Sequence, residues 1–555
     1  MSWYKLSGAA AQVESTESPE AARKHLSHHV PESFTLGELA DAVREPLGRA
    51  SATKPAVSST NIAEVRAQLL AVLVCLRCED RVRRSSADQD AVGDLANSIT
   101  KIIAPAVSQG EGVDQDGDLP AVFNETLTQA REQLVQYCTT FSSLGIQSLE
   151  ALMKLASPVR LDDEVLLTLV AFADQTRDWT TPEAKAAATR LLEQQFRDAM
   201  PTKEHFITEV VLQSYLRPLF SRAKPASITA SGRKAEYADS SAARGENIPD
   251  DSALTKPWKY TDLRAIPAVA WAVHEADTQL IAQHWPLFIP VLLALADDST
   301  TPIRRQGLLT LTDFLSKFPD RTLHDTGLAK VFEDAVFPTL AFLPSLTPEA
   351  ESVELLEPAY GALLSLANKQ PRAGKDGIPG GPKNGLLDRM LRDGVFMAYF
   401  HAKAHVRLVE VLCQQTEAIV NEMGIHAVKH LKDLIPMLSA IMTDPFAPVA
   451  PGTLLAAVGA LQAVLANCWP RIPASPWQDE IINALALCWL HVAEHDRRAA
   501  GTEATYAAIE RQLATSAQAL AAVLKTAEQG PINLSSHVAP LLAKEPRLAQ
   551  LFPSS

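Results

Sequence analysis

The positions of apolar residues along this chain follow a helical period almost throughout. Between Asn61 and Cys78 the apolar residues recur every three or four positions and widen into a nearly continuous stripe, which predicts a buried helix. Thr181-Pro182 supplies a capping hydroxyl and a first-turn proline, and predicts another helix that runs to about Met200. Similar patterns predict helices over three further segments: 121–141, 145–156 and 162–176.

A helical hairpin is the clearest unit of this pattern. The apolar residues over 280–295 form one helical face, and the polar residues 297–300 make a turn. A second helix over 301–318 then begins with Pro302 in its first turn.

The hairpin recurs along the chain. Pro290 and Asp298 correspond to Pro436 and Asp444 with an offset of 146 residues, and Pro338 marks a weaker copy. The three prolines lie 48 and 98 residues apart, and 98 is twice 49. A helix–turn–helix unit of this length is typical of HEAT repeats. The sequence therefore predicts an all-α fold, an α-solenoid of HEAT-like helical hairpin repeats.

The residues that define the repeat have physical roles. Such a hairpin cannot bury both apolar faces alone, so it stacks on the next, and the small residues over 452–468 permit close approach. Proline within the first helix bends it. An acid lies at the turn and bases lie at the start of the second helix, Asp298 with Arg304 and Arg305. Surface ion pairs contribute at most about 1 kcal/mol, so we expect these charges to set the register of the repeat and packing to supply its stability. The repeat-defining residues are Pro290, Asp298, Arg304, Pro338, Pro436 and Asp444.

Polar stretches between the helical patterns set the expected domain organisation. Prolines at 31, 46 and 55 interrupt the first sixty residues, and apolar anchors are lost over 221–257. We expect a loosely ordered lead-in with one or two short helices over 1–60, an N-terminal helical region over 61–220, a linker or long loop over 221–257, and a HEAT-like array over 258–555 with an exposed loop at 370–385.

Composition narrows the function classes. The 555 residues carry 51 basic and 65 acidic side chains, a net charge of −14, so we expect no direct binding to nucleic acid. Six dispersed cysteines and a start without an apolar core favour an intracellular protein without disulfides. The uncharged stretch between Asp444 and Arg471 is interrupted by prolines and is too weakly apolar to span a membrane, so we expect a buried helix and no membrane partner.

Several patterns resemble metal or phosphate sites without completing one. The segment 114–125 has the acidic spacing of a calcium loop, but Leu119 replaces the glycine of the sharp turn. Cys75 and Cys78 have the spacing of a zinc pair without a second pair, which favours a core position. The glycine-rich residues 374–385 lack the phosphate-loop pattern.

Two histidine pairs and a basic cluster complete the candidates. His401 with His405, and His426 with His430, are four residues apart, so each pair would share one face of a helix, but neither has an evident third ligand. We therefore expect no catalytic residue, no metal and no cofactor. Basic residues surround the expected linker and suit a solvated loop or a docking patch for an acidic partner: Arg217, Arg222, Lys224, Arg233 and Lys234.

Segments within and after the expected linker resemble a known family, the Tel-two-interacting protein two family. The resemblance covers about 205–370 well and 395–490 loosely. It rests on Ser227-Ile-Thr-Ala-Ser-Gly-Arg-Lys234, Lys256-Pro-Trp-Lys-Tyr260, Trp271-Ala-Val, His284-Trp-Pro-Leu-Phe-Ile-Pro290, Arg305-Gln-Gly-Leu-Leu309, Thr326–Leu340 and Leu343-Pro-Ser-Leu-Thr-Pro-Glu349.

The resemblance implies a non-enzymatic scaffold, the second interacting subunit of the TTT complex. Its partners would be the other helical-repeat subunits of that complex and, indirectly, phosphatidylinositol-3-kinase-related kinases and the heat-shock chaperone machinery. This implies a cytoplasmic and nuclear protein that acts in TOR signalling, the DNA-damage response and telomere maintenance, with some members in the ASTRA complex. The candidate partner contacts are Trp258, Trp285 and Arg305, although the apolar stripe on which Trp285 lies favours a core position for it.

Two alternatives remain open from the residues. The chain would also suit another HEAT-repeat scaffold, such as a transport receptor or a phosphatase regulatory subunit. An enzyme with a site assembled from dispersed residues, such as the histidine pairs, is the alternative from a different class.

Overall fold

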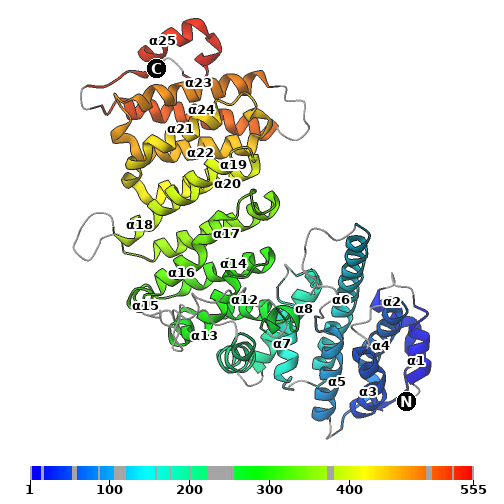
Figure 1. The fold of residues 1–555 in the computed structure, drawn as a ribbon. Helices are drawn as coiled ribbons and strands as arrows, with labels where there is room; N and C mark the ends of the chain where they lie inside the picture. Colours follow the sequence, from blue (N-terminus) through cyan, green and yellow to red (C-terminus); the bar gives the residue numbers. More distant parts are fainter. Residues whose placement is uncertain are drawn as a thin grey trace. The chain divides into compact units, whose positions relative to one another are not determined.

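The computed structural model is helical throughout its described part, apart from one parallel pair of two-residue strands, β1 (Phe34–Thr35) and β2 (Val82–Arg83) (Figure 1). It describes residues 3–13, 18–52, 59–85, 88–105, 121–156, 159–174, 177–198, 202–221, 252, 255–371, 381–495, 503–527 and 530–552. The chain divides into two compact units, Met1–Ala294 and Leu295–Ser555.

The first unit contains the helices up to the division, which falls within α13 (Thr278–Ala296). Most of the predicted linker at 221–257 lies outside the described residues. The earlier elements are α1 (Trp3–Ala10), α2 (Pro19–Leu26), α3 (Leu36–Ala52), α4 (Ser59–Arg77), α5 (Asp88–Ile103), α6 (Ala121–Ala156), α7 (Asp163–Ala171), α8 (Pro182–Asp198), α9 (Lys203–His205), the π-helical η3 (Phe206–Leu216), α10 (Arg217–Leu219), α11 (Pro257–Tyr260) and α12 (Ala265–Glu275).

The second unit continues with paired helices, joined by short 3₁₀ turns and one π-helical segment. Its elements are α14 (Thr301–Lys317), α15 (Asp320–Thr326), α16 (Leu328–Val336), η4 (Phe337–Ala341), α17 (Glu349–Asn368), α18 (Pro382–Arg389), the π-helical η5 (Met390–Phe396), α19 (Met397–Ala402), α20 (Val406–Met423), η6 (Gly424–His430), α21 (Leu431–Met442), η7 (Ala447–Val449), α22 (Pro451–Cys468), η8 (Trp469–Arg471), α23 (Pro476–Glu494), α24 (Glu503–Leu524), α25 (Leu534–Lys544) and η9 (Pro546–Ala549).

The first sixty residues are more ordered than the sequence led us to expect. Helices α1, α2 and α3 occupy most of this stretch, and α3 continues through Pro46. Proline removes one hydrogen bond from a helix. The burial of Val43 and Leu47 on either side of it offsets this loss, since both side chains are fully enclosed. Helix α3 packs on α5 and α4, so these residues belong to the core of the first unit.

The patterns at 121–141 and 145–156 form one helix, α6, instead of two. Gly145, the first residue of the second pattern, does not break the helix. A Cβ at that position would lie 2.3 Å from Cγ2 of Ile103, so glycine is required there by the close approach of α5. The predicted start at Thr181 is confirmed, because its Oγ1 accepts a hydrogen bond from the Ala184 N–H at 3.1 Å.

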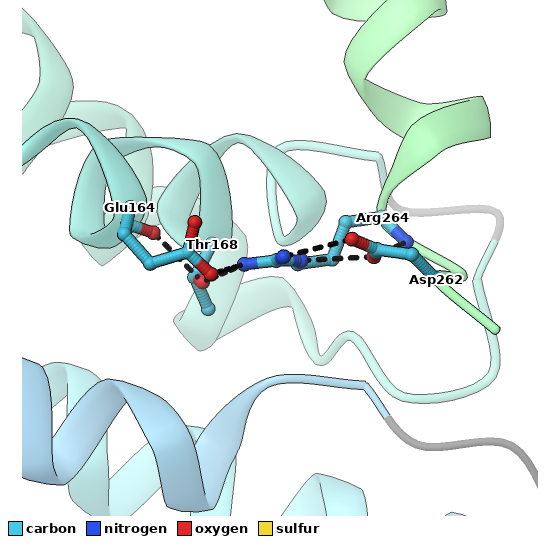
Figure 2. A network of polar contacts seen from close by, with 4 residues as sticks. All are labelled: Glu164, Thr168, Asp262 and Arg264. Carbon is cyan, nitrogen blue, oxygen red and sulfur yellow. Dashed lines mark hydrogen bonds and ion pairs between the residues drawn. The ribbon is translucent and has the colours of Figure 1, made fainter. Parts of the chain in front are cut away.

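A partly buried polar network fastens the chain after α11 to helix α7 (Figure 2). The Arg264 Nε and Nη2 donate to the two carboxylate oxygens of Asp262 at 2.9 and 2.8 Å. Its Nη1 donates to Glu164 Oε1 at 2.5 Å and to Thr168 Oγ1 at 3.0 Å. Burial alone would raise the pKa of Asp262, but the hydrogen bonds from Arg264 outweigh it, and the pKa is lowered. The network joins residues about one hundred positions apart.

The second unit stacks helix upon helix, as a solenoid of HEAT-like hairpins does. Its second helices follow one another in contact: α14 packs on α17, α17 on α20, α20 on α22, and α22 on α24 (Figure 1). The prolines predicted a spacing of twice 49 residues between Pro338 and Pro436. The pair formed by α18–α19 and α20 fills that interval. The predicted fold class is confirmed.

Helix α22 is the buried helix that the sequence predicted over 452–468. Glu417 of α20 reaches across Gly459, where a Cβ would lie 2.6 Å from its Oε2. Two helices among the described residues are long and apolar enough to cross a membrane, Thr278–Ala296 and Pro451–Arg471. The second contains α22, whose apolar side chains are enclosed by α20 and α24, and a core helix passes the same test of length and composition.

The predicted loop at 370–385 ends earlier than expected. Residues 372–380 lie outside the described part, but α18 already begins at Pro382. Lys383 is buried instead of exposed, since its Nζ donates to Asn368 Oδ1 and to Glu422 Oε2, both at 2.7 Å. These bonds connect α18 to α17 and α20, and they explain why the last residues of the stretch are helical.

Glycine at position 307 should be essential to the packing of α14. A Cβ there would lie 2.6 Å from the carbonyl carbon of Leu295 and 2.7 Å from the backbone nitrogen of Ala296. Gly307→Ala is therefore expected to lower the free energy of unfolding by about 1–3 kcal/mol, measured by denaturant unfolding. Gly361→Ala on α17 is the matched control. A Cβ added at position 361 would have nothing within 4 Å, so this substitution should stabilise the protein by about 0.5–1 kcal/mol. Equal effects of the two substitutions would contradict this packing.

The Asp262 network should make the first unit sensitive to acid. Because the pKa of Asp262 is lowered on folding, its contribution is present above its unfolded pKa, about 3.9, and is lost as the pH falls through the folded value. Asp262→Asn should be destabilising by about 2 kcal/mol at neutral pH. Thermal unfolding between pH 7 and pH 3 should show the gap between wild type and variant closing on acidification. Glu164→Gln is the control with a smaller expected effect, since Glu164 is more than half exposed. A gap that stays constant with pH would disprove the role of the Asp262 charge.

Candidate interaction surface

The two aspartates that define the repeat have the same local role. Asp298 Oδ1 accepts a hydrogen bond from the Thr300 N–H at 2.9 Å. Asp444 Oδ1 accepts one from the Phe446 N–H at 2.8 Å. Each carboxylate thus closes a turn onto the residue two positions later, ahead of the second helix of its hairpin. The sequence offset of 146 residues therefore corresponds to a shared turn geometry.

Arg304 makes contacts other than the ion pair with Asp298 that the sequence suggested. Its Nε donates to the backbone carbonyl of Asp298 at 2.7 Å, and its Nη1 to Thr339 Oγ1 at 3.3 Å. Its guanidinium also lies 4.4 Å from the centre of the Phe342 ring. Arg304 is buried, and it joins the turn before α14 to η4 of the next hairpin. The offset of 146 residues places Ala450 at the corresponding position, so this contact is not repeated.

Two of the three prolines lie within the first helices of their hairpins, and the third follows such a helix. Pro290 is within α13 and Pro436 within α21, while Pro338 is in the 3₁₀ segment η4.

One candidate partner contact is placed in the core. Trp258 is fully buried and stacks on Phe220, with ring centres 4.8 Å apart. It cannot contact a partner from this position, and it instead joins the two ends of the segment 221–257. Trp285 and Arg305 are half-buried, on α13 and α14. Of the basic cluster, only Arg217 lies in the described part, where it is exposed.

The histidine pairs do not share a helix face. Helix α19 ends at Ala402, so His401 lies on α19 and His405 precedes α20. His426 is exposed, whereas His430 is buried against Asp388, with Nε2 2.8 Å from Oδ1. The described residues contain no group of three or more His, Cys, Asp or Glu that would hold a metal ion.

Of the other two metal candidates, the structure describes the cysteine pair but not the calcium-like segment. Cys75 and Cys78 are buried as expected, and burial, with Cys78 nearby, raises the pKa of the Cys75 thiol. The calcium-like segment 114–125 lies outside the residues whose side chains are described.

A ladder of polar contacts joins the starts of the second helices. Thr301 Oγ1, at the start of α14, donates a hydrogen bond to Glu351 Oε2 of α17 at 2.5 Å. Glu349 Oε2, also on α17, lies 3.0 Å from Nδ1 of His405, which precedes α20. Further contacts join α20 to α22 and the turn before α22 to α24. The ladder places the turns within successive hairpins along one edge of the second unit.

Exposed apolar side chains gather on this edge. Leu346 is 88% exposed, Phe400 73% and Phe446 78%, each in or beside a turn that precedes a second helix. We call the following six residues the apolar edge: Leu346, Met397, Phe400, Val406, Phe446 and Val449. They are more than half of the large apolar side chains that are exposed in the described part of the chain. Concentrations of this kind mark interaction sites.

Two of the turns on the apolar edge lie close together. Thr453 Oγ1, at the start of α22, donates to the Val406 carbonyl at 3.2 Å. Burial raises the pKa of Tyr399, and the nearby Asp444 carboxylate raises it further. The hydrogen bond and the electrostatic interaction show that the end of α19 and the start of α20 lie next to the turn 443–450.

Sequence reasoning missed the apolar edge because it sought chemistry in polar residues. A usable signal was present: Leu346 lies between Pro344 and Pro348, and Phe446 between Pro445 and Pro448. Prolines mark turns, and turns lie on the surface, so an apolar side chain enclosed by them is exposed.

A solved structure resembles the chain at low similarity. The crystal structure of importin beta matches with a TM-score of 0.34 and 10% sequence identity, covering 98% of this chain and 90% of that chain. A likeness this distant carries no functional argument.

A family model gives the stronger comparison. The model of the Tti2 family matches residues 165–449, slightly more than half of the sequence. The match extends from α7 to the end of η7 and includes all six residues of the apolar edge. The chain therefore belongs to the Tti2 family, the family of Tel-two-interacting protein 2.

Proposed function

We propose that this chain is a non-enzymatic scaffold subunit of the TTT co-chaperone complex. In that role it supports the maturation and stability of phosphatidylinositol-3-kinase-related kinases, and through them DNA-damage, telomere and TOR signalling. Its direct partners are the other helical-repeat subunits of the complex. The kinases and the heat-shock chaperone machinery are reached indirectly, in cytoplasm and nucleus.

The observation that carries this proposal is the Tti2 family match across 165–449. The architecture of the second unit supports it, since stacked helical pairs present long surfaces built from many turns. Such surfaces suit binding to another extended protein.

The apolar edge is the surface that we propose for contact with a partner subunit. Exposing Phe400 and Phe446 to water is unfavourable, and covering them recovers that free energy. Aromatic side chains that become buried at an interface typically dominate its affinity. The polar ladder behind them holds the turns in place, so little ordering is required on binding.

Removing the two aromatic side chains should separate the chain from its partners without unfolding it. Phe400→Ser with Phe446→Ser is expected to reduce co-purification of the other subunits at least about 30-fold, because the loss of even one such anchor costs about 2 kcal/mol. Affinity purification from cells followed by mass spectrometry would measure this. Wild type should recover two large helical-repeat proteins and a related kinase.

The matched control is Leu541→Ser on α25, an exposed apolar residue away from the apolar edge, which should leave recovery unchanged. Recovery of transport cargo or of a phosphatase core with wild type would support the alternative scaffolds and reject the proposed function. Normal recovery of the TTT subunits by the double variant would reject only the proposed surface.

A further inference from the structure

Residues 530–552 fold back on the helical pair α23–α24, and we call them the strap. They contain α25 and η9, and Figure 1 shows α25 beyond α23 and α24, on the side away from α21 and α22. Helix α25 contacts α24, and η9 contacts α23. Elsewhere in the stack that side of a helical pair is covered by the next pair. The strap therefore lies where a further helical pair would stack.

Two ion pairs and a set of apolar side chains hold the strap in place. His537 Nε2 lies 2.8 Å from Oδ1 of Asp479, in the first turn of α23. Arg547 Nη1 donates to Oε1 of Glu494, the last residue of α23, at 2.9 Å, and Arg547 also donates to Glu545 within the strap. The strap thus spans α23 from its first turn to its last residue. Its buried apolar residues are Leu534, Val538, Leu548, Leu551 and Phe552.

The strap is attached less firmly than the helices beneath it. Leu534 and Val538 are the buried residues among the 11 of α25, whereas eight of the 19 residues of α23 are buried. A helix this short is not stable alone in water, and Pro540 removes one of its hydrogen bonds. Both ion pairs join side chains that are 42–71% exposed, so they contribute little. A segment with these properties opens at a lower free energy than the stack that it covers.

We propose that the strap is a detachable cover over a docking surface for an amphipathic segment of a partner protein. The surface is the outer side of α23 and α24. The partner segment carries the strap's own pattern, with apolar residues in the places of Val538 and Phe552 and basic groups opposite Asp479 and Glu494. The strap itself shows the chemistry of this occupant, because it is seated on the surface. The inference does not depend on the family of the chain.

The strap and the partner segment compete for one place, so the strap sets the apparent affinity. Because the strap belongs to the same chain, its effective concentration at the surface is high, on the order of mM for a short connection. A segment that makes the same contacts therefore binds well only when the strap is released.

The test uses the full chain and a fluorescein-labelled peptide with the sequence of residues 530–552, followed by fluorescence anisotropy. Val538→Ser with Phe552→Ser removes two buried apolar side chains and should release the strap. This variant should bind the peptide at least about tenfold more tightly than wild type, because its own strap no longer competes. Hydrogen exchange followed by mass spectrometry should show the amides of α25 exchanging at least about tenfold faster.

The control variant is Leu541→Ser, because Leu541 is an exposed apolar residue of α25. It should leave both peptide binding and hydrogen exchange as in wild type. A control peptide with Ser at the positions of Val538 and Phe552 should not bind the released variant.

A charge reversal opens the strap without changing its apolar contacts. His537→Glu with Arg547→Glu places carboxylates against Asp479 and Glu494, and should speed the exchange of the α25 amides about threefold or more. Adding Asp479→Lys with Glu494→Lys should restore slow exchange, since both pairs are then re-formed with opposite sign.

Three results would overturn the proposal. The first is peptide binding that is equal in wild type and the released variant, or missing from both. The second is fast exchange that persists in the fourfold charge variant. The third is loss of the main thermal unfolding transition in the released variant, because the strap would then belong to the core of the stack.

Discussion

The close stacking of the second helices is the constraint on which the second unit depends. A single hairpin of this length leaves an apolar face in water, so each pair is stable only against its neighbours. Close approach requires small residues at the contact, as Gly307 beneath the end of α13 and Gly459 beside Glu417 show. Helix α22 illustrates the result, since it lies within a stretch long and apolar enough to cross a membrane and is enclosed by α20 and α24.

This stacking also decides what the surface offers. Because the hairpins repeat in register, their turns align, and the polar ladder from Thr301 to Tyr506 fixes that alignment. Turns that are far apart in sequence, such as those beside Phe400 and Phe446, are thereby placed along one edge. An exposed apolar residue in one turn would be unremarkable, whereas several in register form a surface.

The first unit is held together by other means. Its polar network around Arg264 joins residues on either side of the segment 222–251. Trp258 stacks on Phe220 across the same segment. Neither contact follows a repeat, so neither was visible as periodicity, and Trp258 was misassigned to the surface because a single tryptophan beside a polar stretch gives no indication of which side it faces.

The sequence by itself determined the helical fold class, the hairpin at 280–318 and the repeat near 48 residues, because apolar periodicity and turn residues act locally. It also carried the family resemblance that the family match confirms. Only the tertiary structure decided that α3 passes through Pro46, that Arg304 contacts Thr339 and that the apolar edge exists. Each of these depends on residues brought together by packing, where burial outweighs local preference and where exposure is a property of the whole stack.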